Sequence, residues 1–154
     1  MYKQILCPVD GSPTSDCGMT EAIHLAKDQN AKLRFLHVID TYFPILDVNG
    51  DLNVVYITDI LRNNGKKVLK KAEESAYKAG VMADSKMVEV IGGRISKYVL
   101  SQAEEWPADL IVMGTHGLRG IERLVMGSDA ETVVRTSPVP VLLVRNTQTS
   151  RGKS

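Results

Sequence analysis

The sequence Leu110-Ile-Val-Met-Gly-Thr-His-Gly-Leu-Arg-Gly-Ile-Glu-Arg-Leu-Val-Met-Gly-Ser128 combines an apolar run, a glycine-rich loop and a helix start. The apolar run predicts a buried strand, and the residues that follow Ser128 predict a helix to Arg135. Glycine has no Cβ, so the loop backbone can approach a ligand closely. A helix that begins at Ser128 exposes N–H groups and the positive end of its dipole. We therefore predict an anion site here, with the phosphates of a nucleotide as its ligand.

The spacing of the glycines excludes two common nucleotide-binding loops. A P-loop requires Gly-Lys-Ser/Thr at the helix start, and the Rossmann fingerprint requires G-x-G-x-x-G after the first strand. The observed pattern, G-x2-G-x9-G-S, instead resembles the ATP-binding signature of the universal stress protein family. Three further segments are similar to that family and occur in its order: Cys7-Pro-Val-Asp-Gly-Ser12, Leu36-His-Val-Ile-Asp40 and Ser137-Pro-Val-Pro-Val-Leu-Leu-Val144.

The length and the charge of the chain limit what it can be. A chain of 154 residues fits one domain, in which roughly 70% of the unfolded chain's surface becomes buried. We expect residues 1–146 to form a nucleotide-binding domain and residues 147–154 to form a polar tail. The net charge of +1 argues against the extended basic face that a nucleic acid would need, and it leaves a local basic patch open. We find no signal peptide and no run approaching the ~20 apolar residues of a membrane span, so we expect a cytoplasmic protein.

Apolar runs and helical periodicities alternate along the chain. Strands are predicted at residues 4–9, 32–39, 86–91, 110–113 and 138–144. Helices are predicted from Pro13 after a Ser12 N-cap, from 52 to 79, between Gly93 and Pro107 with Ile95, Val99 and Ala103 inward, and after Ser128. This alternation predicts an α/β fold with one open, parallel, five-stranded sheet and helices on both of its faces. Cys7 and Cys17 are expected to be buried, reduced thiols.

The resemblance implies a Rossmann-like fold of the adenine nucleotide alpha hydrolase-like type, with strand order 3-2-1-4-5. The chain then reverses direction between the first and fourth strands, which is where open α/β sheets bind ligands. Asp10 follows the first of these strands and Gly114 follows the other. The implied ligand is ATP or another adenine nucleotide, accompanied by Mg²⁺ or Mn²⁺.

We assign site roles on this basis. Asp10 is expected to meet the ribose or the metal, and its alternative role is to cap the turn. The residues expected to flank the adenine are Pro8, Val9, Val38 (through its backbone) and Met113. The residues expected to hold phosphates are Gly114, Gly117, Gly127 and Ser128. His116 and Arg119 lie on the loop, where they either neutralise charge or have loop-structural and solvent-facing roles. His37 is expected to be packed and hydrogen-bonded.

The start of the last helix carries two acidic residues. Ser128-Asp-Ala-Glu131 matches a capping box, in which Ser128 and Glu131 bond each other's backbone N–H. Asp129 suits an empty helix N-terminus but would repel a triphosphate. Three alternatives remain open for this residue, which we include in the site: a metal ion lies between the charges, the side chain points away, or the affinity is modest.

Two further segments predict contacts. The proline-containing strand at 138–144 is typical of a sheet edge, and the resemblance implies a homodimer through Val139–Val144. The long connection over residues 40–51 is interpreted as a lid or a partner contact. The lysines from 66 to 71 are interpreted as a solvated helix face. We expect no nucleic acid and no membrane among the partners, and the protein partners are not identified by the sequence.

Three classes of function fit these observations. The first is a nucleotide-dependent stress or signalling protein that acts through its dimer and its partners. The second is a slow ATP-hydrolysing enzyme, which would need a metal, a base and a positioned water. The third is an interaction module with a non-functional nucleotide cleft. No dedicated catalytic constellation is legible, so weak ATPase activity is the most we expect.

Overall fold

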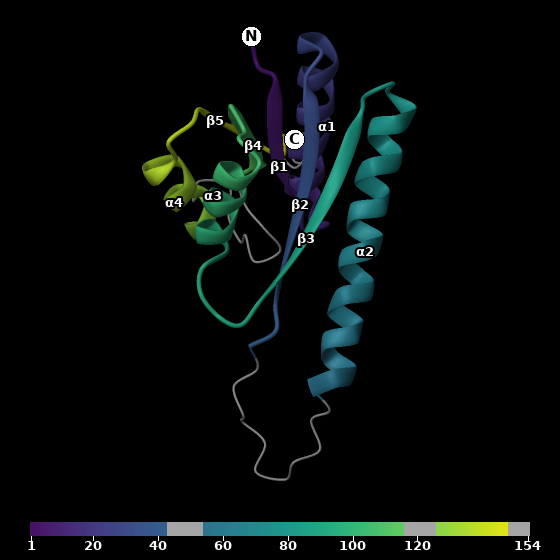
Figure 1. Ribbon diagram of the computed structural model, residues 1–154, viewed down its shortest axis with the longest axis vertical. Coiled ribbons are helices and arrows are strands. Elements are labelled where there is room, and N and C mark those ends of the chain that lie inside the picture. Colours follow the sequence, from purple (N-terminus) through teal and green to yellow (C-terminus); the bar gives the residue numbers. More distant parts are fainter. Residues whose placement is uncertain (43–53, 116–125, 148–154) are drawn as a thin grey trace, which may run out of the picture.

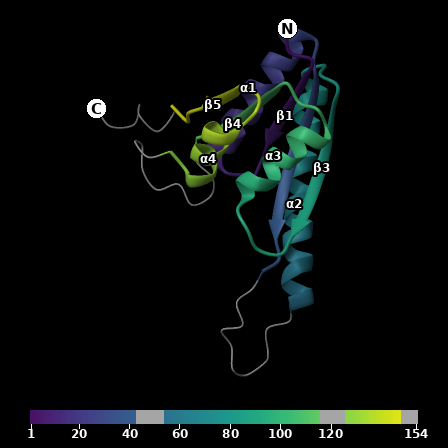
Figure 2. The same ribbon diagram turned by 60° about the vertical axis from the view of Figure 1, so that its left-hand side comes forward.

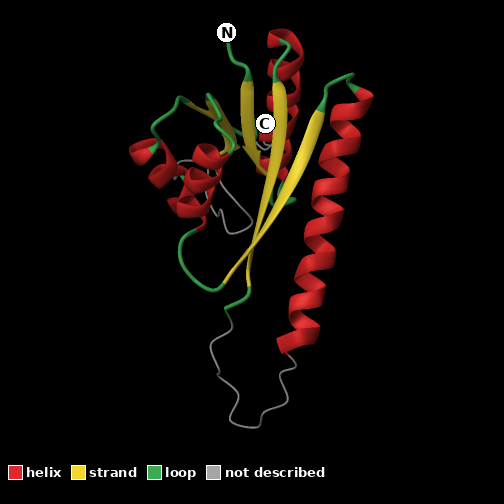
Figure 3. Ribbon diagram, viewed as in Figure 1, coloured by secondary structure: helices red, strands yellow, loops and turns green. Residues whose placement is uncertain are grey.

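The computed structural model describes residues 1–42, 54–115 and 126–147, and within them strands and helices alternate (Figures 1 and 3). The elements are β1 (Gln4–Pro8), α1 (Pro13–Gln29), β2 (Lys32–Asp40), α2 (Val54–Lys78), β3 (Ala83–Val90), α3 (Ile95–Glu105), β4 (Leu110–Gly114), α4 (Ser128–Thr136) and β5 (Val141–Val144). Most of the 40–51 connection and of the 147–154 tail lies outside the described residues, so both predictions about them stay predictions.

The strands form one five-stranded sheet in the order β3-β2-β1-β4-β5, and every neighbouring pair is parallel. Helices α1 and α2 cover one face of the sheet, and α3 and α4 cover the other (Figures 1 and 2). Alternate strand residues enter the two cores, so Ile5 and Phe35 face α1 and α2 while Leu6 and Leu36 face α3 and α4. The predicted fold class and strand order are confirmed.

Local signals fix the beginning and the end of α1. The hydroxyl of Ser12 accepts a hydrogen bond from the N–H of Ser15 at 3.2 Å, and Pro13 occupies the first turn, as predicted. Asn30 ends the helix with φ of 51°, a left-handed conformation that asparagine tolerates. The apolar stripe Met19, Ala22, Ile23 and Ala26 is buried against the sheet. The start of α1 is therefore held rigidly beside the end of β1.

The predicted bounds of the third and fifth strands are wrong. β3 begins at Ala83 instead of Lys86 because its polar first residues pair with β2, where Arg34 contacts Asp84 through two hydrogen bonds of 2.7 and 2.8 Å. Ile91 lies beyond the strand and is exposed. β5 begins at Val141 instead of Pro138, since Pro138 and Pro140 have no N–H to donate to the ladder.

Two smaller expectations concern single side chains. Ile95, predicted to face inward, is exposed because it is the first residue of α3, whereas Val99 and Ala103 are buried as predicted. Cys7 and Cys17 are free thiols, as predicted, but only Cys7 is buried, whereas Cys17 is partly exposed. Burial raises the pKa of the Cys7 thiol. In the described part of the chain, no helix is long and apolar enough to cross a bilayer.

Candidate functional site

The order in which strands are added to the sheet reverses between the parallel neighbours β1 and β4. β1 continues through α1 to β2 and β3 on one side of the sheet, whereas β4 and β5 lie on the other side. Leu6 of β1 pairs with Ile111 of β4 in parallel register, so the carboxyl ends of the two strands lie side by side. Asp10 and Gly114, which are far apart in the sequence, are thereby brought to the same edge of the sheet. This edge is where ligands bind in open α/β folds.

The predicted adenine-flanking residues divide between the two faces of the sheet. Met113 is buried in the core beneath α3 and α4, and Val38 packs against that core. Pro8 follows Leu6 by two residues and so lies on the same face. Val9 belongs to the opposite core, beneath α1 and α2. Pro8, Val38 and Met113 therefore share one face near the strand ends, and Val9 can meet a ligand on that face only through its backbone.

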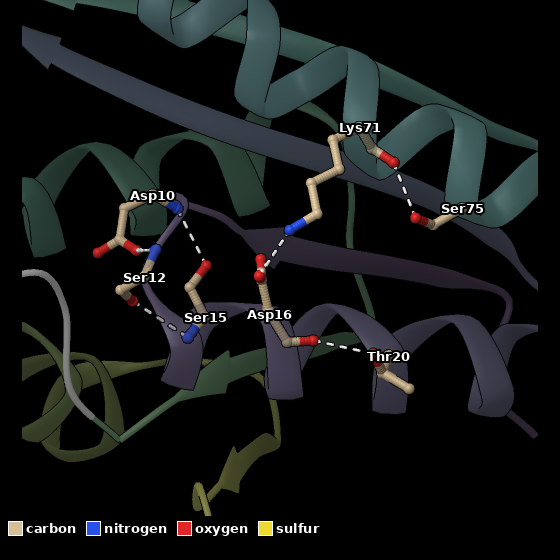
Figure 4. A network of polar contacts seen from close by, with 7 residues as sticks. All are labelled: Asp10, Ser12, Ser15, Asp16, Thr20, Lys71 and Ser75. Atoms are coloured by element: carbon tan, nitrogen blue, oxygen red, sulfur yellow. Dashed lines mark hydrogen bonds and ion pairs between the residues drawn. The ribbon is translucent and has the colours of Figure 1, made fainter.

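Asp10 forms a hydrogen-bonded turn with the start of α1 (Figure 4). Its Oδ1 accepts the N–H of Ser12 at 2.9 Å, and its own N–H donates to the hydroxyl of Ser15 at 3.0 Å. The second carboxylate oxygen points away from the other labelled side chains (Figure 4). The turn-capping role is thus observed, and it uses one oxygen of the carboxylate while leaving the other directed outward.

Gly114 lies in close contact with the first turn of α1. A Cβ placed on Gly114 would come within 2.7 Å of the carbonyl oxygen of Thr14. A Cβ placed on Gly18 would in turn lie 2.9 Å from the backbone nitrogen of Gly114. Two glycines therefore let helix α1 sit directly on β4. This packing role accounts for Gly114 without a ligand, and the glycine spacing in the sequence does not reveal it.

The two ends of the glycine-rich segment are joined by a hydrogen bond. The N–H of Gly127 donates to the carbonyl of Thr115 at 2.7 Å, and the N–H of Thr115 donates to Val144 of β5 at 3.1 Å. The start of α4 is therefore held beside the end of β4. Three predicted site residues, His116, Gly117 and Arg119, lie outside the described residues. Their roles stay predictions.

The predicted capping box at the start of α4 is wrong. Gly127 is the N-cap, and its carbonyl accepts the N–H of Glu131 at 2.9 Å. The helix therefore begins one residue earlier than the capping box requires, and its N-cap residue provides no side-chain hydrogen bond. The carboxylate of Glu131 pairs with Arg135 instead of turning back. Ser128 is consequently an exposed residue of the first turn, and helix capping does not explain its hydroxyl.

Asp129 contacts the neighbouring helix. Its Oδ1 accepts the N–H of Ser96 in the first turn of α3 at 3.1 Å, where the local N-cap residue, Arg94, provides no side-chain hydrogen bond. The sequence left three alternatives for Asp129: an intervening metal ion, a side chain that points away, or a modest affinity. The structure shows the carboxylate bound to the start of α3. A carboxylate at a helix N-terminus is favourable. The inclusion of Asp129 among the ligand-binding residues stays a prediction, and it rests on the backbone of this residue.

Replacing Asp129 with alanine is expected to lower the free energy of unfolding by ~1 kcal/mol, the typical cost of losing a helix cap. The loss leaves the N–H of the buried Ser96 without its carboxylate partner. Urea unfolding measures the change, and Glu131→Ala is the matched control. That variant removes an exposed pair with Arg135, so it should cost no more than ~0.5 kcal/mol. Equal stability of the two variants would contradict the capping role.

Other features of the described residues do not extend this site. A surface groove between α3 and α4 is lined by Arg94, Ser96, Lys97, Leu100, Ser101, Glu104, Thr132 and Thr136, and it includes none of the predicted site residues. Within residues 1–42, 54–115 and 126–147, no group of three or more His, Cys, Asp or Glu side chains is arranged to hold a metal ion. The strand ends of β1 and β4 therefore remain the candidate site.

Comparisons of the sequence and of the structure with known proteins all find members of one family. The model of the universal stress protein family matches residues 1–145. Universal stress protein MJ0531 of Methanocaldococcus jannaschii is 35% identical over 145 residues, which span 94% of this chain and 83% of that protein. The structure of universal stress protein UspA from Lactobacillus plantarum superposes with a TM-score of 0.81 at 25% identity, covering 94% of this chain and 98% of that one. A universal stress protein solved in complex with cAMP superposes with a TM-score of 0.66 at 28% identity, covering 93% and 97%.

Proposed function

Because this chain belongs to the universal stress protein family, we propose that it binds an adenine nucleotide, with ATP as the expected form, at the carboxyl ends of β1 and β4. Nucleotide occupancy then alters its contacts with a second copy of the chain and with protein partners in a stress or signalling response. The relative solved with cAMP supports an adenine nucleotide as the class of ligand.

One juxtaposition carries the proposal. The last residue of β4, Gly114, lies against Thr14 in the first turn of α1, which follows the Asp10 turn. The N–H of Gly127 at the start of α4 is hydrogen-bonded to the carbonyl of Thr115, directly after β4, at 2.7 Å. On this basis we propose that the apolar face, the outward carboxylate oxygen and the start of α4 border one ligand site. An apolar surface suits the adenine ring, a polar oxygen suits the ribose hydroxyls, and a helix N-terminus suits the phosphates.

Each part of the nucleotide has proposed partners. Pro8, Val38 and Met113 offer the apolar surface for adenine, with Val9 contributing through its backbone. The outward oxygen of Asp10 binds the ribose hydroxyl or a Mg²⁺ or Mn²⁺ ion that the phosphates also hold (Figure 4). The backbone of Gly114, Gly127 and Asp129 and the exposed hydroxyl of Ser128 meet the phosphates. Gly117, His116 and Arg119 complete the phosphate contacts in the proposal.

The proposed dimer uses the edge of the sheet at β5, which is the edge opposite β3. β5 is the last strand in the sheet order, and its Leu142 is exposed. An edge strand with free backbone groups pairs readily with another chain. We place the contact of the homodimer at Val139–Val144. In this arrangement β5, whose Val144 carbonyl accepts a hydrogen bond from the N–H of Thr115, also contacts the second copy. Sedimentation with and without nucleotide measures whether occupancy changes the dimer.

The test of the proposed function is to release bound small molecules from the purified protein with acid and identify them. We expect an adenine nucleotide, and a rise in melting temperature when Mg-ATP is added to protein stripped of ligand. GTP is the control and should give a smaller rise. Absence of both nucleotide and rise would support the interaction module with a non-functional cleft. Phosphate release above background that Asp10→Asn removes would support the slow ATP-hydrolysing enzyme.

A further inference from the structure

The peptide group between Val9 and Asp10 is held on both sides by side chains. Its carbonyl oxygen, which belongs to Val9, accepts a hydrogen bond from Nδ1 of His37 at 2.7 Å. Its N–H, which belongs to Asp10, donates to the hydroxyl of Ser15 at 3.0 Å (Figure 4). The first partner comes from β2 and the second from α1. The peptide plane that precedes the Cα of Asp10 therefore has a fixed orientation.

The chemistry of the contact defines which role Nδ1 of the His37 ring has. A carbonyl only accepts, so Nδ1 of His37 must carry a hydrogen. Both the imidazolium and the neutral tautomer with hydrogen on Nδ1 satisfy this requirement. The hydrogen bond therefore does not need a change of charge to form.

A glycine in the middle of α2 makes room for this ring. A Cβ on Gly65 would lie 2.8 Å from Cδ2 of His37 and 2.8 Å from the sulfur of Met87. Glycine costs helix stability relative to alanine, and here it lets α2 close directly onto the imidazole. The ring is thus enclosed between α2 and the strand end, which keeps its Nδ1 directed at Val9.

We propose that His37 and Ser15 are positioning residues that fix the carboxylate of Asp10 for the nucleotide. This inference rests on the proposed function of the site. With the preceding peptide fixed and Oδ1 bound to the N–H of Ser12 at 2.9 Å, the carboxylate has little freedom left. Its outward oxygen then meets the ligand without paying for ordering on binding. A ring that served packing alone would act through its shape and would not need its N–H.

Paired substitutions separate the N–H from the ring. Asparagine carries an N–H close to the place of Nδ1 but lacks the ring, whereas phenylalanine keeps a ring and lacks the N–H. Mg-ATP is titrated calorimetrically into the full chain at a temperature where circular dichroism shows every variant to be folded. His37→Phe and Ser15→Ala are each expected to weaken binding ~10-fold, the usual size of one lost hydrogen bond. His37→Asn is expected to stay within about threefold of the unsubstituted chain.

Thr20→Ala is the control for the loss of a hydroxyl on the same helix. The hydroxyl of Thr20 bonds the carbonyl of Asp16 and lies outside the Asp10 turn (Figure 4), so this variant should bind Mg-ATP as tightly as the unsubstituted chain. Unchanged affinity in His37→Phe would overturn the positioning role, while binding by the unsubstituted chain would still support the proposed function.

A second measurement does not depend on the nucleotide. Hydrogen exchange of the Asp10 amide is followed by NMR in the ligand-free variants. Faster exchange in His37→Phe than in His37→Asn supports the positioning of this peptide, and equal rates overturn it. Absence of nucleotide binding by the unsubstituted chain would contradict the proposed function. The exchange rates would still decide whether His37 orders the Asp10 turn.

Discussion

Replacing Gly114 with alanine is expected to lower the free energy of unfolding by ~3 kcal/mol, the upper part of the usual range for overpacking. The added methyl group would meet the carbonyl oxygen of Thr14 at 2.7 Å and its carbonyl carbon at 2.9 Å. These are backbone atoms, so no flexible side chain can move aside. Relief of the clash requires α1 to move away from β4, and it carries the Asp10 turn with it. We therefore expect Mg-ATP binding to weaken in the same variant.

Gly80→Ala is the matched control, because it tests backbone conformation without a clash. Gly80 has φ of 77° and no atom within 4 Å of an added Cβ, whereas Gly114 is not among the glycines with positive φ. The control should cost ~1 kcal/mol through backbone strain alone. Urea unfolding of the two variants gives the comparison. A Gly114→Ala variant as stable as Gly80→Ala would contradict the close packing of α1 on β4.

Replacing Gly117 with valine is expected to abolish the stabilisation that Mg-ATP confers. A ligand present at 100 times its Kd adds ~2.7 kcal/mol to the free energy of unfolding. The glycine spacing of the sequence assigns the backbone at Gly117 to the phosphates, and a branched side chain there would block the approach. The measurement is the melting temperature with and without Mg-ATP for the unsubstituted chain and the variant.

The ligand-free melting temperature is the control for Gly117→Val, and it should change little compared with the loss of the nucleotide-dependent rise. Gly117→Ala provides an intermediate step, because a single methyl group obstructs less than an isopropyl group. A nucleotide-dependent rise that survives in Gly117→Val would place the phosphates away from this loop. The rest of the proposed site, at Asp10 and the start of α4, would then have to hold the phosphates by another route.

The arrangement of the elements was predictable because local signals agree with the fold. Apolar runs mark the buried strands, and Ser12 and Pro13 mark the start of α1 as the structure has it. The strand order came from the resemblance to a family and not from periodicity. The start of β3 differs from the prediction because Asp84 and Ser85 are polar, and their pairing with β2, where Arg34 contacts Asp84, joins residues 50 positions apart.

The candidate site shows the same division between local and tertiary information. The spacing of the glycines pointed to Gly114 and Gly127, but not to the contact of Gly114 with Thr14, which exists only once α1 packs on β4. The sequence at Ser128 fits a capping box, yet backbone geometry moved the cap to Gly127. The contact of the Asp129 carboxylate with the N–H of Ser96 depends on the position of α3, which the local sequence does not show.

Three residues that we propose to support the site have no clear signal of that role in the sequence. Ser15 has no distinguishing pattern, and Gly65 is an unfavourable residue inside a helix whose reason the sequence does not give. The roles of both depend on the neighbours that the fold brings to them. His37 was expected to be packed and hydrogen-bonded, which is confirmed, but its partner could not be named. A polar side chain inside an apolar strand was the only hint that a specific contact existed.

The central claim is that an adenine nucleotide binds where β1 and β4 end and α4 begins. The most direct measurement follows the backbone amides by ¹⁵N NMR while Mg-ATP is added to the ligand-free protein. We expect the largest shift changes at Asp10, Gly114, Gly127 and Ser128, with the residues of the α3–α4 groove little affected. Changes centred on Lys97 and Thr136 of that groove, or no changes at saturating Mg-ATP, would contradict the claim.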